Sequence, residues 1–257
     1  MSREDPDVVD SVARALALIE AFDQHPTLTV TEAAELTGLT RATARRILLT
    51  LVRLGFAAPE DRAYRLTPRV LRLGYAYLSA TPVSERAQPH MRTLADRVRE
   101  SCSMATLDGG EVVYLARVPA SRSMTITLGV GARLPAYPTS MGRVLLAALP
   151  AAELEQYLGD TVLEQLTEHT LTDAVALRAE LDRVRQQGVA VVDQEREEGV
   201  RSAAVPVRDA SGAVVAALNV SVNAARISIT QLREDVVPLL RETATAISAD
   251  LGHRAGS

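Results

Sequence analysis

Arginines between residues 40 and 53 have the spacing of a surface that reads nucleic acid. If this stretch is a helix, one face carries the apolar residues Ala44, Ile47, Leu48 and Leu51. The opposite face then carries Ala42, Arg45, Arg46 and Arg53. Guanidinium groups pair with guanine edges or with phosphates, so an apolar back and an arginine-rich front predict a recognition helix. Leu49 also falls on the outer face and departs from this pattern.

The elements that would hold this helix in place lie on both sides of it. Residues 28–66 read LTVTEAAELTGLTRATARRILLTLVRLGFAAPEDRAYRL. Thr31 is expected to cap a first short helix. Gly38 gives the backbone freedom for a tight turn, and Thr40 is expected to cap the second helix, which runs to about Arg53. Upstream, a supporting helix capped by Ser11 is predicted to reach Phe22, with an inward face of Val12, Ala15, Leu16 and Ile19.

A short hairpin is predicted directly after the second helix. Residues 56–58 and 63–66 resemble strands, and the tip between them is Pro59, Glu60, Asp61 and Arg62. A surface helix with ordinary solvated arginines is the alternative, but helix, glycine turn, arginine-faced helix and hairpin in this order favour a winged helix-turn-helix. We expect the major groove to meet Thr40, Arg41, Ala42, Thr43, Arg45 and Arg46, and a phosphate or the minor groove to meet Arg62.

The distribution of charge supports a basic module on an acidic body. The 257-residue chain has a net charge of −4, which alone argues against a nucleic-acid binder. From Thr40 to Tyr75, however, eight arginines and two acids give a local charge of +6, while 18 arginines and 22 acids from Ala76 onward give −4. This asymmetry is what site-directed DNA binding predicts.

Several kinds of chemistry are not indicated. The four histidines, His25, His90, His169 and His253, lack metal-ligand spacing, so neither a metal site nor another cofactor is expected. There is no P-loop and no G-x-S-x-G elbow, and the lone Cys102 is interpreted as a core residue. No apolar run has the length of a membrane span, and the acidic start MSREDPDVVD is unlike a signal peptide, so a cytoplasmic location is expected.

A second group of polar residues interrupts apolar patterns in the C-terminal half. Asn219 and Ser221 alternate with valines in VVAALNVSV, and Ser202 opens the strand before it. Thr139 and Ser140 begin a helix, where free N–H groups suit an anion, and Asp193 ends an apolar strand. Such groups converging in an apolar cavity would form a small-molecule site. The alternative is that each is a satisfied core or capping residue. The acids Glu197 and Glu198 are interpreted as a charged loop.

The C-terminal half alternates between helix and strand patterns. Helices are predicted over 67–80, 83–100, 139–149, 151–157 and 171–187, and over 228–251 with a bend at Pro238. Strands are predicted over 101–108, 111–118, 124–130, 189–192, 201–208 and 213–222, two of the connections being hairpin turns. The lone glycine pair at 129–131 is interpreted as a turn. The fold class is therefore α+β: an N-terminal winged helix-turn-helix and a C-terminal GAF-like α/β effector domain.

In order along the chain, four segments resemble the IclR-type transcriptional regulators: SVARALALIEAF, the stretch LTVTEAAELTGLTRATARRILLTLVRLGF, GARLPAYPTSMGRVLLA and EEGVRSAAVPVRDASGAVVAALNVSV. MTITLGVGARLPAYPTSMGRVLLA, VVDQEREEGVRSAAVPV and the ATARR of the recognition helix further resemble the subgroup that controls aromatic-acid breakdown through protocatechuate and β-ketoadipate, which includes regulators responding to 4-hydroxybenzoate. The resemblance implies a DNA-binding domain over 1–66, a helical linker over 67–81 used in dimerisation, and an effector-binding and oligomerisation domain over 82–257. It also implies homodimers or pairs of dimers on palindromic double-stranded DNA.

The resemblance also implies which residues contact the effector. Carried over position by position, these are Ser140, Met141, Asp193, Val200, Ser202, Asn219 and Ser221. Many relatives have Cys at the position of Ser202, Ser at that of Asn219, and Gly or Ala where Ser140 and Met141 stand. The more polar set here fits a hydroxylated aromatic carboxylate or a dicarboxylate, and puts smaller ligands of the glyoxylate or pyruvate type in doubt.

Three hypotheses of function follow. The first is a ligand-responsive DNA-binding regulator of aromatic-acid catabolism that is not an enzyme. The second is a DNA-binding protein whose C-terminal domain only oligomerises. The third is an enzyme that uses Asp193 and Ser202, although the sequence offers no activated nucleophile. Binding of aromatic or dicarboxylic acids would separate the first two, and turnover of such an acid would support the third.

Overall fold

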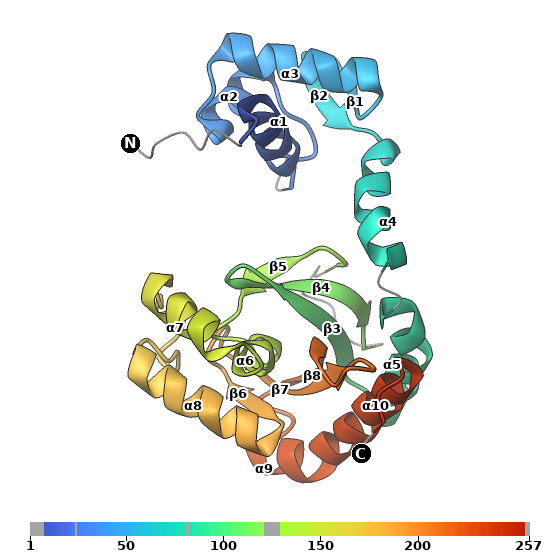
Figure 1. Ribbon diagram of the computed structural model, residues 1–257, viewed down its shortest axis with the longest axis vertical. Coiled ribbons are helices and arrows are strands. Elements are labelled where there is room, and N and C mark those ends of the chain that lie inside the picture. The colour runs from blue at the N-terminus through green and yellow to red at the C-terminus, as the bar shows by residue number, and fades with distance from the viewer. Residues whose placement is uncertain (1–7, 24, 81–82, 121–128, 255–257) are drawn as a thin grey trace. The chain divides into compact units, whose positions relative to one another are not determined.

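A computed structural model describes residues 8–23, 25–80, 83–120 and 129–254 (Figure 1). Contacts divide the chain into two compact units, Met1–Ala80 and Thr81–Ser257. Each unit is treated by itself. The predicted boundary at Thr81 and Pro82 lies outside the described residues. Among the described residues, no helix combines the length and the apolar character needed to cross a bilayer.

The first unit contains the predicted winged helix-turn-helix. Its elements are α1 (Asp10–Glu20), α2 (Val30–Thr37), α3 (Arg41–Leu54), β1 (Ala57–Glu60), β2 (Ala63–Leu66), a 3-10 turn η1 (Pro68–Val70) and α4 (Leu71–Ala80). The three helices α1–α3 enclose a small core that includes Leu18, Leu28, Ala44 and Leu48, each 1% exposed or less. An isolated β-bridge between Leu28 and Tyr64 of β2 connects the wing to the segment before α2.

Two details of the predicted helix starts are wrong. Helix α2 is capped by Thr29 rather than Thr31, because Glu32 completes a reciprocal capping box with Thr29. The Glu32 carboxylate accepts from the N–H of Thr29 at 2.8 Å, and the Thr29 hydroxyl accepts from the N–H of Glu32 at 3.3 Å. Helix α1 begins after Val9 with no side-chain cap, so Ser11 does not cap it.

The inward face of α1 also differs from the prediction. Leu18 is fully buried, whereas Val12 is 55% and Leu16 50% exposed. Apolar residues lie around much of this helix, so periodicity did not fix its orientation. Leu18 packs in the core with Phe22, one turn further on, and this pairing sets the rotation of the helix.

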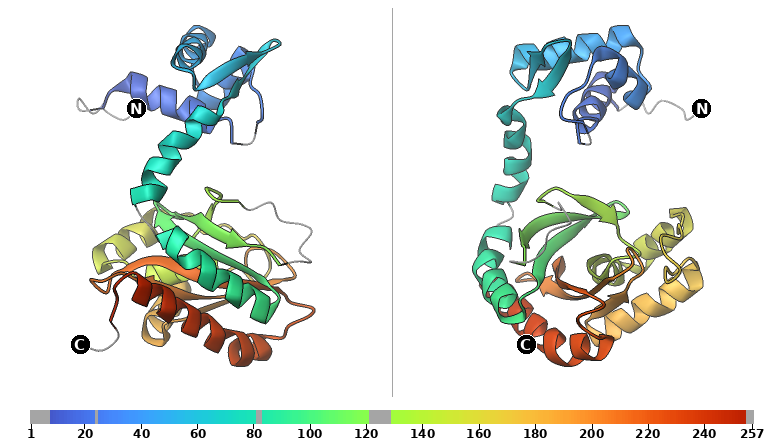
Figure 2. Two further views of the ribbon diagram at one scale, coloured as in Figure 1. Left: turned by 90° about the vertical axis from the view of Figure 1, so that its right-hand side faces the viewer. Right: turned by 180° about the vertical axis from the view of Figure 1, so that it is seen from behind.

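The second unit is one antiparallel sheet with helices on both faces (Figure 2). The six strands run in the order β5-β4-β3-β8-β7-β6. Their bounds are β3 (Ser101–Asp108), β4 (Glu111–Val118), β5 (Arg133–Pro135), β6 (Ala190–Asp193), β7 (Val200–Arg208) and β8 (Val214–Asn223). The hairpins β3–β4 and β7–β8 confirm the turns predicted at Asp108 and Asp209. The turn predicted at 129–131 is confirmed, the short strand β5 that follows it was not predicted, and most of the strand predicted over 124–130 lies outside the described residues.

Two layers of helices cover this sheet. Helices α5 (Val83–Val98) and α10 (Val237–Asp250) lie side by side against one face, whereas α6 (Ser140–Ala147) packs on the other face together with α7 (Ala151–Asp160) and α8 (Ala174–Gln187) (Figures 1 and 2). The α6 layer buries an apolar core that includes Leu146, Leu177 and Leu181, each fully buried. This arrangement confirms the predicted α+β class.

The last helical stretch has the predicted interruption. It consists of the short α9 (Ile229–Gln231), one π-helical turn η2 (Leu232–Val236) and α10, whose first turn contains Pro238. Because proline has no N–H to donate to the preceding turn, the hydrogen-bond pattern changes just before it. Ser228 caps the start through a capping box with Gln231.

Candidate functional site

The outer face of α3 is a row of exposed arginines. Arg41, Arg45, Arg46 and Arg53 are all exposed, while Ala44, Leu48 and Leu51 on the opposite face are buried. Among the residues that the structure describes, none of these four arginines makes an ion pair with an acid, although Arg14 and Arg65 in the same unit do. The guanidinium groups are therefore available to phosphates and base edges.

Local contacts fix how α3 is presented. Gly38 ends α2 with φ of 65°, a left-handed conformation that glycine adopts without strain, and this confirms the predicted tight turn. Thr40 is the N-cap of α3, as predicted, and its hydroxyl accepts from the N–H of Thr43 at 3.2 Å. The two threonine hydroxyls also lie 2.9 Å apart, so both are engaged in the cap. Ala42 is exposed beside them.

The wing is tighter than predicted. Strand β1 extends through Pro59 and Glu60, which pair with Tyr64 and Ala63, so the tip is formed only by Asp61 and Arg62. Arg62 is exposed at this turn, where the sequence placed it. At the base of the wing, the Arg69 guanidinium stacks on the Phe56 ring at 5.4 Å from its centroid.

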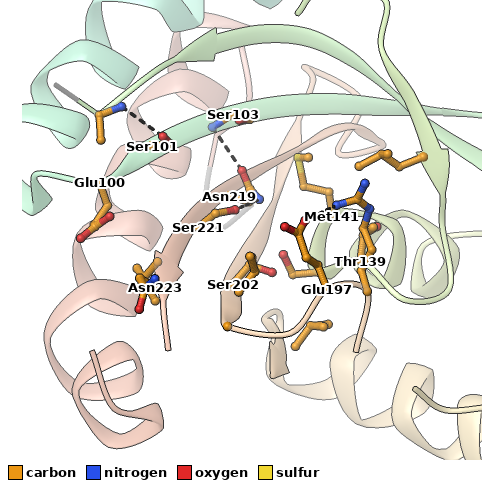
Figure 3. A pocket seen from close by; sticks show the side chains of 18 of the residues that line it. Glu100, Ser101, Ser103, Thr139, Met141, Glu197, Ser202, Asn219, Ser221 and Asn223 are labelled. Carbon is orange, nitrogen blue, oxygen red and sulfur yellow. Dashed lines mark hydrogen bonds and ion pairs between the residues drawn. The ribbon is translucent and has the colours of Figure 1, made fainter. Parts of the chain in front are cut away.

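A cavity of about 460 Å³ lies in the second unit, between the sheet and the start of α6 (Figure 3). Side chains in one cross-strand row point to the same face of a sheet. The register aligns Val192, Ser202, Ser221 and Ser101 in one such row. The next row on that face contains Asn219, Ser103 and Arg117, and all seven residues line the cavity. The floor is thus a polar patch on an otherwise apolar sheet.

The amide of Asn219 is held in place within this floor. Its oxygen accepts from the N–H of Ser103 at 3.1 Å, and its nitrogen donates to the Ser221 hydroxyl at 3.1 Å (Figure 3). Asn219 is only 4% exposed, so these bonds compensate its burial. Val200, at the start of β7, also lines the cavity.

A β-bulge brings two further groups into the cavity. The pairing of β3 with β4 shifts between Met104 and Ala105, so Arg117 pairs with Ser103 while Tyr114 pairs with Ala105. Without the extra residue, positions 114 and 117 would face opposite sides of the sheet. Burial raises the pKa of the Tyr114 phenol, and the positive charges of Arg196 and Arg117 act in the opposite direction. Two cations therefore lie near this phenol.

The roof of the cavity is the start of α6. Thr139 caps this helix by accepting from the N–H of Gly142 at 3.0 Å, and Ser140 and Met141 follow it. Ser140 is 1% exposed, and its hydroxyl has no hydrogen-bond partner among the described residues. A buried hydroxyl without a partner is costly, and Ser140 is one of the residues that line the cavity, so it is a candidate contact for a ligand group.

The roof is held by a close backbone approach and a buried ion pair. A Cβ atom at Gly142 would lie 2.0 Å from the carbonyl oxygen of Ala136, so only glycine fits there. The next residue, Arg143, is 2% exposed and pairs with Glu195 at 2.5 Å. Glu195 also accepts from the N–H of Leu171 at 3.1 Å. This pair joins α6 to the 196–199 segment, which forms another wall of the cavity.

One residue predicted to contact the effector lies outside the lining of the cavity. Asp193 does not line the cavity, because it pairs with Arg201 in β7, on the sheet face opposite to Ser202. The Asp193 carboxylate lies 2.6 Å from Nε of Arg201, and this hydrogen bond holds the pKa of Asp193 below its usual value. The alternation of side chains along a strand, which sequence reasoning did not apply to Asp193, explains the difference. An enzyme that pairs Asp193 with Ser202 loses its geometric basis.

Several cavity residues were not predicted. Tyr114, Arg117 and Arg196 line it, and so do Glu197 and Glu198, which were interpreted as an ordinary charged loop. The bulge in β4 has no signature in the sequence, but Arg117 in a half-buried strand was a usable signal. Cys102 is buried as expected, and burial raises the pKa of its thiol to about 12. The described residues contain no cluster of potential metal ligands.

Comparison with known proteins places these two sites in a family. Residues 11–61 match the model of the IclR helix-turn-helix domain, and residues 75–249 match that of the bacterial transcriptional regulator IclR C-terminal domain. The chain belongs to the IclR family. This IclR-family protein is accordingly a DNA-binding transcriptional regulator with an effector-binding domain, and the predicted recognition is confirmed.

Individual relatives are similar over almost the whole regulator. It is 46% identical over 252 residues to the Pca regulon regulatory protein of Pseudomonas putida, covering 97% of this chain and 85% of the relative. It is 36% identical to the p-hydroxybenzoate hydroxylase transcriptional activator of Acinetobacter baylyi, over 94% and 91% of the two chains. The crystal structure of an IclR homologue from Microbacterium hydrocarbonoxydans with 4-hydroxybenzoate superposes with a TM-score of 0.83, at 29% identity, covering 94% and 99% of the two chains.

Proposed function

We propose that this regulator controls genes of aromatic-acid catabolism in response to a small aromatic carboxylate bound in the cavity of its second unit. The observation that carries the proposal is the distribution of polarity in that cavity. Ser140, whose buried hydroxyl has no partner among the described residues, lies on the roof, the Asn219 amide lies on the floor, and the cations Arg117 and Arg196 line the same cavity as Tyr114. Apolar surface comes from Leu134, Met141 and Val192.

Such a cavity suits a hydroxylated benzoate. The ring would pack on the apolar lining, the carboxylate would pair with arginine, and the ring hydroxyl would reach the Ser140 or Asn219 side. Relatives named for the Pca regulon, for p-hydroxybenzoate hydroxylase and for a 4-hydroxybenzoate complex support this class of ligand. An aliphatic dicarboxylate of the β-ketoadipate type is the alternative ligand.

On the DNA side, we propose that Arg45 and Arg46 contact base edges, and that Thr40, Arg41, Ala42 and Thr43 complete the surface in the major groove. Arg62 at the wing tip contacts a phosphate or the minor groove. The exposed, ion-pair-free state of these arginines among the described residues supports the proposal. The regulator would have two arrangements that differ in affinity for the operator. The effector can shift operator affinity only as far as it binds one of these arrangements more tightly than the other.

We also propose that a second copy of the chain covers α4, the helix of the predicted linker. Leu71, Leu73, Tyr75 and Tyr77 on this helix are 70%, 52%, 69% and 51% exposed. Exposed apolar surface of this extent is typical of an interface. Two DNA-binding units in one dimer would read a palindromic operator. Sedimentation of the full chain should show a dimer or a pair of dimers, and Leu73→Glu should shift it toward monomer.

Ligand binding is tested by a thermal-shift panel followed by calorimetry. 4-Hydroxybenzoate, protocatechuate, β-ketoadipate and, as negative controls, pyruvate and glyoxylate are compared with the full-length protein. We expect a hydroxybenzoate or a dicarboxylate to raise Tm and the two small acids to have no effect. Ser140→Ala should weaken binding, while Ser211→Ala in the exposed β7–β8 turn should not. If none of the acids shifts Tm at concentrations far above any plausible Kd, a C-terminal unit that only oligomerises would be favoured.

A further inference from the structure

The cavity contains its own carboxylates as well as its own cations. Four arginines line it, Arg99, Arg117, Arg196 and Arg226, together with three glutamates, Glu100, Glu197 and Glu198. Two of the glutamates already hold an arginine, because Glu100 pairs with Arg226 and Glu197 pairs with Arg196. A carboxylate effector that needs a guanidinium would therefore enter a site in which acids of the protein already compete for the arginines.

Arg196 is the arginine for which this competition matters most. It lines the cavity together with Tyr114 and Arg117 of the sheet, and its positive charge opposes the effect of burial on the pKa of the Tyr114 phenol. Its Nη1 lies 3.1 Å from the Glu197 carboxylate, and the two side chains are 31% and 47% exposed. Figure 3 shows Glu197 on the side of the cavity that also carries Met141 and Thr139. Arg117, by contrast, has no acidic partner within the described part of the chain.

We infer that Glu197 is an internal competitor for the effector: it pairs with Arg196, and the effector carboxylate displaces it from that guanidinium. This inference rests on the proposed function, because it requires an anionic ligand in this cavity. The exchange replaces one carboxylate by another on the same guanidinium, so the gain in binding is the difference between the two pairs. The freed Glu197 moves toward solvent, which alters the 196–199 wall only when an anion is bound.

Calorimetry on the full-length protein tests the inference with 4-hydroxybenzoate and its neutral analogue 4-hydroxybenzamide, or with the acid that binds best in the panel and its amide. Glu197→Gln should tighten binding of the acid about two- to fivefold, the range expected for one partly exposed ion pair. Binding of the amide should not change, because it has no charge with which to compete. In an Arg196→Gln background, the added Glu197→Gln change should give no gain.

Glu198→Gln is the matched control. It removes the same charge at the next position, where no ion pair is formed within the described residues, so it should give a clearly smaller gain than Glu197→Gln. An acid affinity that is unchanged or weakened by Glu197→Gln would overturn the inference while leaving the proposed function intact. Equal gains in affinity from the two variants would also overturn it, because the removal of any negative charge near the cavity would then explain both gains. If the wild-type protein binds no acid, the proposed function and this inference fall together.

Discussion

Two sets of arginines, one in each unit, are used in opposite ways. On α3, Arg41, Arg45 and Arg46 are exposed and have no acidic partner among the described residues. In the second unit, Arg143 and Arg201 are held by carboxylates, and Arg143 is almost completely buried. The first set is free to bind a polyanion such as DNA. In the second set, Arg143 joins α6 to the segment beside the cavity, and Arg201 ties β7 to β6 on the opposite face of the sheet.

Because of this difference, substitutions in the two sets should affect different properties: affinity for DNA in the first set and stability of the fold in the second. An unpaired, solvated guanidinium costs the fold little, so its loss should affect DNA binding and not stability. Removal of a buried guanidinium leaves its carboxylate partner as an uncompensated buried charge. The substitution of such an arginine should therefore affect stability first. The two classes can therefore be distinguished by which measurement a substitution changes.

The largest effect is expected from Arg143→Met. Removing this side chain leaves Glu195, which is 8% exposed, without its cation, and should lower the free energy of unfolding by about 3–5 kcal/mol. Arg178→Met is the matched control, because Arg178 pairs with Glu155 at 2.7 Å on the surface and should cost at most about 1 kcal/mol. Urea denaturation of both variants measures this. Equal losses would contradict a special role for the buried pair.

A smaller effect, on DNA instead of stability, is expected from Arg45→Ala. If Arg45 contacts a guanine through both of its donor groups, the substitution should weaken operator binding by about 1–3 kcal/mol and relax the base preference at one position. The midpoint of urea unfolding should stay within error of wild type. Arg14→Ala, which removes an exposed arginine paired with Asp10, serves as the control. An unchanged sequence preference, measured by selection from random duplexes, would exclude the role of Arg45.

The smallest effect is expected from Asp193→Asn. Arg201 lowers the pKa of Asp193 below its ordinary value of 3.8, so the pair stabilises the fold above that pH and loses its effect as the pH falls through the lowered pKa. The carboxylate is 40% exposed, so the loss on substitution should be about 1 kcal/mol or less at neutral pH. The difference between wild type and variant should shrink below pH 3.8. A difference independent of pH would show that packing, not charge, is involved.

Local signals made much of the first unit predictable. Gly38, the Thr40 cap and the helical spacing of Ala44, Leu48 and Leu51 each specify one element, and all were confirmed. The orientation of α1 could not be obtained in this way, because apolar residues occur around most of that helix and packing with Phe22 decides it. The spacing of Thr29 and Glu32 is the sequence signature of the capping box that starts α2.

The cavity was predictable only in part. Alternation along β8 identified Asn219 and Ser221, and the resemblance to the family added Met141 and Val200, all of which line the cavity. The positions of Tyr114 and Arg117 depend on a bulge that arises from the pairing of two strands, and no local pattern encodes it. Their roles in binding, like the boundaries of the predicted linker, stay predictions.

The most direct test is binding of the full-length regulator to a fluorescent duplex of its own promoter, with a scrambled duplex as competitor, at physiological salt and with or without the hydroxybenzoate that binds best. We predict a preference for the promoter of at least about a thousandfold, the low end for site-specific DNA binders. We also predict that the acid changes this affinity, whereas its amide does so much less. Equal affinity for both duplexes, or a promoter affinity that the acid does not change, would contradict the claim that this protein binds a specific DNA sequence under the control of an effector in the cavity.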